Sequence, residues 1–382
     1  MSIKRVGIIG GGQLAWMMAG AAEKLGIELV IQTPNSDDPA VEIAAETIFA
    51  PIDEATATAT LATRCDVITF ENEFVNLAAL APIAAQGVCF RPRLEVLSSL
   101  LDKYHQRCYL QQIGLPVPKF ATLEDISSSP QFPLVLKSRR HGYDGQGTFI
   151  IQDAASLQHT LDGFAGKPSS FLVEEFVPFV KELAIIAARS PNGEIVTYPI
   201  VETQQEKQVC RRVIAPADII TEVAAEIEEI ASTLLNNLQA VGIFGIELFL
   251  TKENKVLVNE IAPRTHNSGH FTLDACETSQ FEQHLRAVSD LPLGSTALRC
   301  RSAVMVNLLG YEDGQNDYIV KQQQLAALPQ AYVYWYGKKR SRLGRKLGHV
   351  TVLLDTADYA QATSVATNIE SIWYPTDLMQ KP

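Results

Sequence analysis

Along the first 100 residues, short runs of apolar residues alternate with longer stretches in which apolar residues recur at helical spacing. Continuous apolar runs predict buried strands, and the helical spacing predicts amphipathic helices. The predicted strands are 5–9, 28–32 and 66–70, and the predicted helices are 13–25, 53–63 and 76–86. Strands that alternate with helices favour a parallel, doubly wound α/β sheet.

The pattern changes after Leu101. A predicted helix at 102–113 ends at Gly114, with Pro116 and Pro118 beyond it, which is a strong stop signal. The strands predicted after it are 133–137, 148–151, 171–177, 183–189, 194–201, 243–250 and 255–261, with a long helix at 218–240. Hairpins with interspersed helices indicate an α+β middle domain.

A third, β-rich unit begins near residue 300, with strands predicted at 302–309, 331–337 and 349–354. The 382 residues are enough for two or three domains of ordinary size. We therefore divide the chain into an N-terminal doubly wound domain (1–100), a central α+β domain (101–298) and a small β-rich C-terminal domain (299–382).

Composition narrows the class of partner. Hydrophobic residues make up 47% of the chain and charged residues 20%, which is typical of a globular protein. Acidic residues outnumber basic ones 43 to 32, giving a formal charge of −11. A surface of that sign disfavours general binding to nucleic acid or anionic lipid, although a local basic site can still bind a small anion.

The cysteine spacing and the apolar runs indicate in which cellular compartment the protein acts. The six cysteines are scattered and form no C-x-x-C pair, which excludes a zinc pattern and a small disulfide scaffold. No apolar stretch approaches the roughly 18 residues that cross a bilayer, and the chain enters a strand-like run directly. We expect a cytoplasmic protein that binds neither membrane nor nucleic acid.

The first candidate site is a glycine-rich turn. Residues 10–15 follow a strand and fit G-x-G-x-x-A, a turn that brings a helix N-terminus close to an anion. A nicotinamide enzyme also needs an acidic residue at the tip of the second strand, where this chain has Gln32, Thr33 and Pro34. A nicotinamide dehydrogenase is therefore disfavoured, and a tight turn without a ligand stays open as the alternative.

A second glycine-rich segment, 142–148, follows Lys137 at the end of an apolar strand. Three glycines in six residues let backbone amides approach phosphate oxygens, and the lysine adds a positive charge. The spacing is not the Walker pattern, which ends in G-K-[ST]. Arg139, Arg140 and His141 stand just before the glycines, which favours phosphate binding over a plain hairpin turn.

Glu247 and Glu260 lie on two apolar runs joined by a short polar loop. If Glu253 and Asn254 form a two-residue hairpin loop, Glu247 faces Glu260 about 5 Å away on one side of the sheet. Like charges at that spacing are unstable without a cation, and Mg²⁺ takes one or two carboxylates together with substrate phosphates. The alternative is another register in which one glutamate is solvated.

Two further segments are dense in polar side chains. Residues 259–270 place Arg264, His266 and His270 close to Glu260, which is unusual for a solvated loop. Residues 337–346 hold six cationic residues among ten in an otherwise acidic chain. A solvated charged face is the plain alternative for this second segment.

Taken together, these segments resemble the 5-(carboxyamino)imidazole ribonucleotide synthase family of ATP-grasp ligases. The resemblance rests on Gly11–Leu14, Phe70–Glu73, Gly142–Gly147, Asn259–Arg264, His266–His270 and Gly344–His349. It runs from residue 5 to about residue 355, in order and with matching spacing.

The resemblance implies a pre-ATP-grasp domain, a two-lobed ATP-grasp domain that encloses ATP, and a small C-terminal domain. It implies that ATP phosphorylates bicarbonate to carboxyphosphate, whose CO₂ is attacked by the amine of 5-aminoimidazole ribonucleotide in de novo purine biosynthesis. We therefore expect Mg²⁺ as cofactor, ATP, bicarbonate and the ribonucleotide as substrates, and a homodimer.

The resemblance also assigns residues. The nucleotide contacts would be Lys103, Lys137, Gly142, Tyr143, Asp144, Gly145, Gln146, Gly147, Thr148, Glu174, Glu175, Phe176, Val177, Glu182, Gln205, Asn259 and Glu260. The ribonucleotide contacts would be Gln13, Leu14, Glu73, Tyr143, Asn267, Lys338 and Arg345. The Mg²⁺ ligands would be Glu247 and Glu260, and the catalytic residues Arg264, His266 and Asn267.

The chain departs from the family pattern at three places. Lys103 stands where arginine is usual, which keeps the charge and loses the bidentate geometry. Gln205 replaces a usual histidine near the nucleotide, and Ala15-Trp16 replaces a usual Gly-Arg pair near the ribonucleotide. None of these departures removes a metal ligand or Lys137.

Two alternatives stay open from the sequence. Another ATP-grasp ligase, such as the formate-using glycinamide ribonucleotide transformylase, shares the glutamate pair and the C-terminal basic motif. Tyr143-Asp144 and His266–His270 favour the aminoimidazole enzyme. A catalytically silent nucleotide-binding regulator is the second alternative, and the intact glutamates speak against it.

Overall fold

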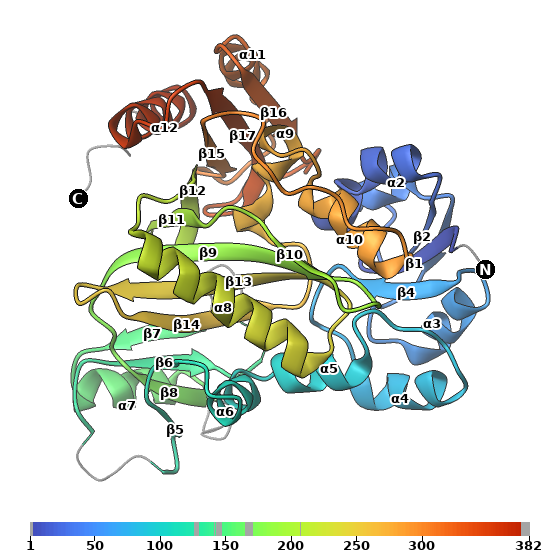
Figure 1. Ribbon diagram of the computed structural model, residues 1–382, viewed down its shortest axis with the longest axis horizontal. Coiled ribbons are helices and arrows are strands. Elements are labelled where there is room, and N and C mark those ends of the chain that lie inside the picture. Colours follow the sequence, from blue (N-terminus) through green and yellow to red (C-terminus); the bar gives the residue numbers. More distant parts are fainter. Residues whose placement is uncertain are drawn as a thin grey trace.

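A computed structural model describes residues 3–125, 130–140, 142, 147–164, 171–206 and 208–375. Figure 1 shows the N-terminal, central and C-terminal parts of the chain gathered around one long central sheet. Among the described residues, no helix combines the length and apolarity that a membrane crossing requires.

The N-terminal part is a parallel four-stranded sheet with strand order β3-β2-β1-β4. Its strands are β1 (Arg5–Ile9), β2 (Glu28–Thr33), β3 (Glu46–Phe49) and β4 (Val67–Phe70). Its helices are α1 (Gln13–Trp16), α2 (Ala19–Leu25), η1 (Pro39–Ile43), α3 (Ala55–Ala62), α4 (Leu77–Ala85) and α5 (Leu94–Leu100). The predicted α/β pattern is confirmed, although the segment 13–25 forms two helices rather than one.

A smaller antiparallel sheet follows, with strand order β5-β8-β6-β7. Its strands are β5 (Phe120–Thr122), β6 (Leu134–Ser138), β7 (Thr148–Ile151) and β8 (Phe171–Glu175). The helices of this region are α6 (Lys103–Gln112) and α7 (Ala154–Asp162). Asp102 caps α6 by accepting hydrogen bonds from the backbone of Tyr104 and His105, which sets Lys103 at the first position of the helix.

The largest sheet has nine strands and joins the central and C-terminal parts. Its strands are β9 (Phe179–Arg189), β10 (Ile195–Thr197), β11 (Val201–Glu206), β12 (Val209–Ala215), β13 (Gly242–Thr251), β14 (Val256–Ala262), β15 (Ser302–Leu309), β16 (Ala331–Trp335) and β17 (Lys346–Leu354). The helices are α8 (Thr221–Leu238), η3 (Asn267–Gly269), α9 (Thr272–Ala275), α10 (Gln280–Val288), α11 (Ile319–Ala326) and α12 (Tyr359–Trp373).

The C-terminal strands continue the central sheet rather than forming a separate one. β12 pairs with β15 in an antiparallel ladder from Arg212↔Val306 to Ala215↔Ala303. The sequence predicted one strand at 194–201, where the structure has two strands with a break between them. β12, with two arginines among its seven residues, was not predicted because its pattern is not continuously apolar.

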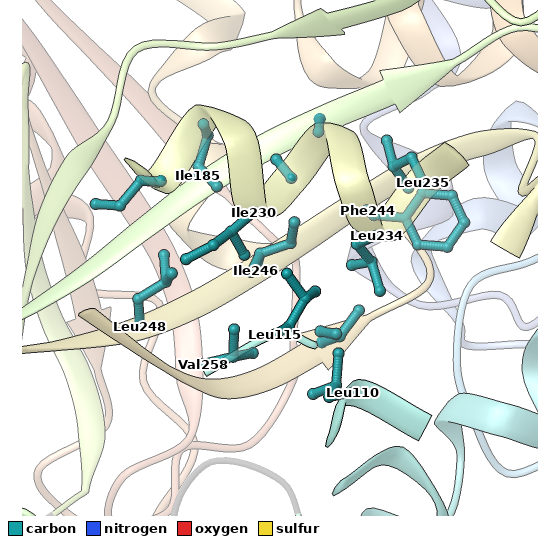
Figure 2. Packing of buried hydrophobic residues seen from close by; sticks show 14 of the residues in the cluster. Leu110, Leu115, Ile185, Ile230, Leu234, Leu235, Phe244, Ile246, Leu248 and Val258 are labelled. Atoms are coloured by element: carbon teal, nitrogen blue, oxygen red, sulfur yellow. The ribbon is translucent and has the colours of Figure 1, made fainter. Parts of the chain in front are cut away.

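Helix α8 closes the main core over the nine-stranded sheet. Its apolar residues recur every three or four positions, as at Ile227, Ile230 and Leu234, and these side chains are buried. Figure 2 shows Ile230 and Leu234 packed against Ile246 of β13 and its neighbours. This core holds the strand pair β13–β14 in place under the site described next.

Candidate active site

A cavity of about 790 Å³ lies between the small sheet, the large sheet and the N-terminal domain. It brings together most residues that the resemblance assigned, from segments far apart in the chain. Those that line it are Gln13, Leu14, Glu73, Lys103, Lys137, Gly142, Thr148, Glu174, Glu175, Phe176, Val177, Glu182, Gln205, Glu247, Asn259, Glu260, Arg264, His266 and Asn267.

The hairpin β13–β14 places two carboxylates opposite each other. Glu247 pairs with Glu260 in the ladder, as the sequence predicted. The loop behind this prediction is different: Thr251 N–H donates to the Lys255 carbonyl, so the loop has three residues, and Asn254 adopts a φ of 59°. A β-bulge at Asn259 shifts the register back by one residue and restores the facing pair.

The two carboxylates differ in charge state. Burial first, and then the facing Glu260, raise the pKa of Glu247 to about 7. Burial also opposes the charge of Glu260, but the adjacent Lys103 and then Lys137 outweigh it and lower its pKa. Lys103 is ion-paired with Glu260 directly. Glu260 is therefore charged and paired, whereas the pKa of Glu247 lies close to neutral pH.

A buried set of charges supports Lys137. Glu174 is ion-paired with Lys137 at 2.7 Å and with Arg107 Nε at 2.5 Å. Arg107 Nη2 donates to the carbonyl of Asn259 at 2.5 Å, and Lys137 Nζ donates to the side chain of Asn259 at 2.9 Å. Burial opposes the charge of Glu174, but Lys137 and Arg107 prevail and lower its pKa to about 2.

These contacts connect the two sheets at one point. Glu174 and Lys137 belong to the small sheet, whereas Asn259 is the bulged residue of β14 in the large sheet. The resemblance assigned Glu174 to the nucleotide, which stays a prediction, and its side chain is ion-paired with Lys137 and Arg107. A nucleotide would then contact the backbone of residues 174–177 rather than the side chain of Glu174.

An apolar part of the cavity suits a planar base. Val135, Phe176, Val177 and Phe179 line it, and the Phe179 ring stacks on Phe249 with centroids 4.7 Å apart. Glu182 lines the same side, where burial and then Glu247 raise its pKa to about 7.

The glycine-rich segment is described only in part. Tyr143, Asp144, Gly145 and Gln146 lie outside the described residues, as does His141. Gly147 has a φ of 83°, and a Cβ on it would lie 2.7 Å from Ser138 Oγ, so a glycine is required there. The Gly147 carbonyl accepts from Ser138 N–H at 2.6 Å, so the end of the segment lies directly beside Lys137.

The N-terminal domain contributes the opposite end of the cavity. Glu71 Oε1 accepts from Leu14 N–H at 3.3 Å, and a Cβ on Gly12 would lie 2.4 Å from the same oxygen. The glycine-rich turn therefore faces one of the protein's own carboxylates. Glu73 is ion-paired with Arg264 Nη2 at 2.9 Å, which links this domain to the loop after β14.

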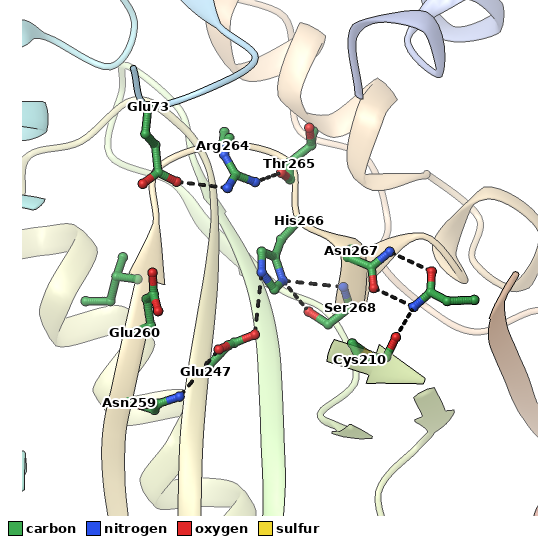
Figure 3. A network of polar contacts seen from close by, with 12 residues as sticks. Glu73, Cys210, Glu247, Asn259, Glu260, Arg264, Thr265, His266, Asn267 and Ser268 are labelled. Carbon is green, nitrogen blue, oxygen red and sulfur yellow. Dashed lines mark hydrogen bonds and ion pairs between the residues drawn. The ribbon is translucent and has the colours of Figure 1, made fainter. Parts of the chain in front are cut away.

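The loop after β14 positions its polar side chains through its own backbone (Figure 3). His266 Nδ1 accepts from Ser268 N–H, and Nε2 lies 3.5 Å from Glu247 Oε1. Asn267 forms a reciprocal amide pair with Asn307 at 2.8 and 2.9 Å. Its amide is thus largely engaged by the C-terminal β15, which limits what it can offer a substrate.

The basic segment lies at the edge of the site. Lys338 Nζ donates to the Lys346 carbonyl at 2.9 Å, and Arg345 Nη1 donates to the Arg340 carbonyl at 2.6 Å. Neither Lys338 nor Arg345 is among the cavity-lining residues, whereas Lys346 is. The assignment of Lys338 and Arg345 to the ribonucleotide stays a prediction. Lys346 is the residue of this basic segment that the tertiary structure adds to the cavity lining.

Each of the three parts of the chain matches a known protein family. Family models match residues 3–99 as a ribonucleotide synthetase preATP-grasp domain, residues 108–281 as an ATP-grasp domain, and residues 303–363 as a phosphoribosylaminoimidazole carboxylase C-terminal domain. The N5-carboxyaminoimidazole ribonucleotide synthase of Synechococcus elongatus is 52% identical over 390 residues, covering 100% of this chain and 98% of the relative. The chain belongs to the N5-carboxyaminoimidazole ribonucleotide synthase family.

Solved structures of this synthase family share the whole fold. The synthetase from Thermotoga maritima is 39% identical, with a TM-score of 0.85 over 97% of this chain and 98% of that one. The Aspergillus clavatus enzyme, in complex with ADP and 5-aminoimidazole ribonucleotide, is 29% identical, with a TM-score of 0.87 over 97% and 98%. The three-part ATP-grasp architecture expected from the sequence is thereby confirmed.

The donor set of this synthase family member fits Mg²⁺. Glu247 and Glu260 face each other, so the ligands on offer are carboxylate oxygens, and Asn259 Nδ2 donates to Glu247 at 3.5 Å beside them. Within the described part of the chain, no group of three or more His, Cys, Asp and Glu side chains forms a complete metal cage. Two carboxylates that leave room for phosphate oxygens and water match how Mg²⁺ is usually bound.

Sequence reasoning missed several residues of the site. Arg107, Glu71 and Lys346 received no role, and they line the cavity or hold residues that line it; His270 was noted close to Glu260 but received no role either. Glu71 stood inside the quoted motif Phe70–Glu73, so that motif was the available signal. Arg107 gave no signal beyond a charge on the buried face of α6, and only the tertiary structure pairs it with Glu174.

Proposed function

We propose that this protein uses ATP to carboxylate 5-aminoimidazole ribonucleotide to N5-carboxyaminoimidazole ribonucleotide, with bicarbonate as the source of the carboxyl group. The observation that carries the proposal is the facing pair Glu247–Glu260 beside Lys103 and Lys137, in one cavity with Gln13 and Glu73. Membership in the synthase family, and the named relative that was solved with ADP and the ribonucleotide, support it.

The end of the site that would hold the ATP phosphates needs positive charge to balance their negative charge. In this proposal Lys137 and Lys103 contact the β- and γ-phosphates, and Glu174 with Arg107 keeps Lys137 directed toward Asn259 and the cavity. Mg²⁺ held by Glu247 and Glu260 would supply Lewis-acid stabilisation of the transferred phosphoryl group. The glycine-rich segment 142–148 would cover the phosphates and exclude water from the labile intermediate.

The nucleotide and the ribonucleotide occupy opposite ends in this proposal. The adenine would lie against Phe176, Val177 and Phe179, with the backbone of 174–177 at its edge and Glu182 on the ribose hydroxyls. Thr148, Glu175 and Gln205 complete the nucleotide side. Gln13, Leu14 and Glu73 would hold the ribonucleotide, and Lys338 and Arg345 its 5′-phosphate.

The chemistry then proceeds between these ends. A bicarbonate oxygen attacks the γ-phosphorus and ADP leaves, so the product is carboxyphosphate. Its breakdown gives phosphate and CO₂, which the amine of the ribonucleotide attacks with loss of a proton. Arg264 and His266, next to Glu247 and Glu73, would bind the bicarbonate and the CO₂, with Asn267 beside them. We further propose that the protein acts in the cytoplasm as a homodimer.

The deciding experiment measures ADP formation with each co-substrate. Turnover should rise with bicarbonate and should couple to carboxylation when 5-aminoimidazole ribonucleotide is present. A parallel reaction with formate and glycinamide ribonucleotide tests the transformylase alternative. If formate supports ATP cleavage while bicarbonate is inert, the substrate assignment is wrong, and no turnover under any condition would favour the silent regulator.

A further inference from the structure

The side-chain amide of Gln280 is fixed by the backbone of the polar loop. His266 N–H donates to Gln280 Oε1 at 2.9 Å, and Gln280 Nε2 donates to the His266 carbonyl at 2.7 Å. The two contacts together determine which end of the amide is nitrogen. The same Nε2 lies 3.0 Å from Nδ1 of His270. Because an amide nitrogen only donates, Nδ1 of His270 accepts this hydrogen bond.

His270 is therefore held in one tautomer. With Nδ1 as the acceptor, the ring proton of the neutral imidazole is on Nε2. The ring is 1% exposed and yet lines the cavity. His349 packs beside it with ring centroids 5.1 Å apart, and its Nδ1 is bonded to the Tyr336 hydroxyl at 2.8 Å.

The surroundings keep this imidazole neutral. Burial first, and then the nearby His349 and Lys346, lower the pKa of His270 well below its usual 6.5. His266 and Arg264 act in the same direction. Of these groups, Lys346 and Arg264 are cations, and positive charge near the ring attracts an anion. A neutral donor in a positive environment is suited to an oxyanion, because it offers a hydrogen bond and no acceptor.

We propose that His270 presents a fixed Nε2–H donor to the carbonate-derived oxyanion of the reaction, and that Gln280 is the positioning residue that maintains the tautomer. The oxyanion would be the bicarbonate or the carboxyphosphate formed from it, so the inference rests on the proposed function. Gln280 acts through the residues that it holds, since its own amide is engaged by the backbone of His266 and by Nδ1 of His270.

The test is a set of variants of the full chain, assayed by steady-state kinetics. His270→Ala should raise the KM for bicarbonate about tenfold or more, with the KM for ATP within about twofold of wild type. His270→Gln keeps an N–H donor near the position of Nε2 and should recover most of the loss. Gln280→Glu places a carboxylate against Nδ1, draws the proton there and should reproduce the His270→Ala defect with the ring intact.

A matched control separates this role from a general loss of packing. His284 is also fully buried, with Nε2 bonded to Thr69 Oγ1 at 2.9 Å, and it does not line the cavity. His284→Gln should leave both KM values unchanged, and the melting temperature of each variant is measured alongside. If His270→Ala does not fold, His270→Gln and Gln280→Glu decide the question between them.

The outcomes distinguish the two proposals. If wild-type turnover does not respond to bicarbonate, the proposed function fails and this inference fails with it. If wild type depends on bicarbonate and the folded variants at His270 and Gln280 keep its KM for bicarbonate, only the inference is wrong. If Gln280→Glu has the wild-type KM for bicarbonate while His270→Ala is defective, the assigned tautomer of His270 is wrong, and its role as a donor is wrong with it.

Discussion

At the scale of single residues, the site depends on charges that neutralise one another before any substrate arrives. Glu174 is almost completely buried and survives as an anion because Arg107 and Lys137 each bond one of its oxygens. A buried charge that loses its partner is strongly destabilising, so these residues act as a unit. Arg107 contributes through two separate nitrogens, one toward Glu174 and one toward the Asn259 carbonyl.

Arg107→Lys tests this double contact. Lysine keeps the charge but offers a single nitrogen, so either Glu174 or the Asn259 carbonyl loses its donor. We expect kcat to fall about tenfold or more, because Lys137 and the bulge next to Glu260 are no longer held together. Arg64→Lys, at an exposed ion pair with Glu46, is the control and should be close to silent. Wild-type kinetics in Arg107→Lys would show that the second contact has no role.

The facing carboxylates make a second prediction at this scale. Glu247→Gln and Glu260→Gln should each lower kcat/KM by orders of magnitude, because each removes a charge that would fix Mg²⁺. Their stabilities should differ without nucleotide. Glu247→Gln should hold or gain stability, since burial already disfavours its charge, whereas Glu260→Gln leaves Lys103 without its partner and should lose stability.

Kinetics at saturating Mg²⁺ and thermal melts without nucleotide measure both effects. Near-normal activity in both variants would contradict the metal role of the pair. A Glu260→Gln variant more stable than Glu247→Gln would contradict the assignment of their charges.

At the scale of elements, the hairpin β13–β14 shows how a bulge can set a site. Thr251 and Lys255 close a three-residue loop, which by itself would move every downstream pair by one position. The bulge at Asn259 corrects the register, so that Glu260 reaches the same face as Glu247. A shift of one residue in a strand turns its side chains to the opposite face.

Inserting an alanine between Asn259 and Glu260 is therefore expected to abolish ATP turnover while the sheet still forms, because Glu260 would then pair with Ile246 and leave the face that carries Glu247. Asn254→Gly, in the loop of the same hairpin, is the control. Its φ of 59° suits glycine, so stability should be unchanged or higher by up to about 1 kcal/mol, with normal activity. Circular dichroism and ADP formation measure the two effects, and an active insertion variant would contradict the bulge model.

At the scale of the whole molecule, one sheet carries residues of the C-terminal part to the cavity. The ladder between β12 and β15 joins it to the central part, and Asn267 is paired with Asn307 across the same boundary. Lys339 is ion-paired with Asp37 of the N-terminal domain at 2.9 Å, so the basic segment 337–346 bridges to that domain. All three parts of the chain thus meet around one site.

The prediction at this scale concerns the phosphate of the ribonucleotide. Lys338→Ala or Arg345→Ala should raise the KM for the ribonucleotide about tenfold or more, since each charge-assisted hydrogen bond contributes roughly 1.5–3 kcal/mol. The KM for ATP should barely move. Arg340→Ala is the control, because Arg340 is exposed and paired with the exposed Asp313. Equal small effects at all three positions would mean that the run is only a charged surface.

The amino-acid sequence alone determined the alternation of elements, the three-part organisation and the identity of the facing glutamates. Those features depend on local periodicity and on residue types at fixed spacing, which are visible without a fold. The pair Glu247–Glu260 was predicted from a loop of the wrong length, and the agreement came from a bulge that the pattern did not reveal.

Only the tertiary structure decided which charges meet. Arg107 pairs with Glu174 across 67 positions and with Asn259 across 152, and Asn267 pairs with Asn307 across 40. The continuity of the central sheet into the C-terminal part, and the fixed tautomer of His270, likewise depend on side chains brought together from distant segments. Hydrophobic periodicity reports which face of an element is buried, and it contains no information on which distant element will cover that face.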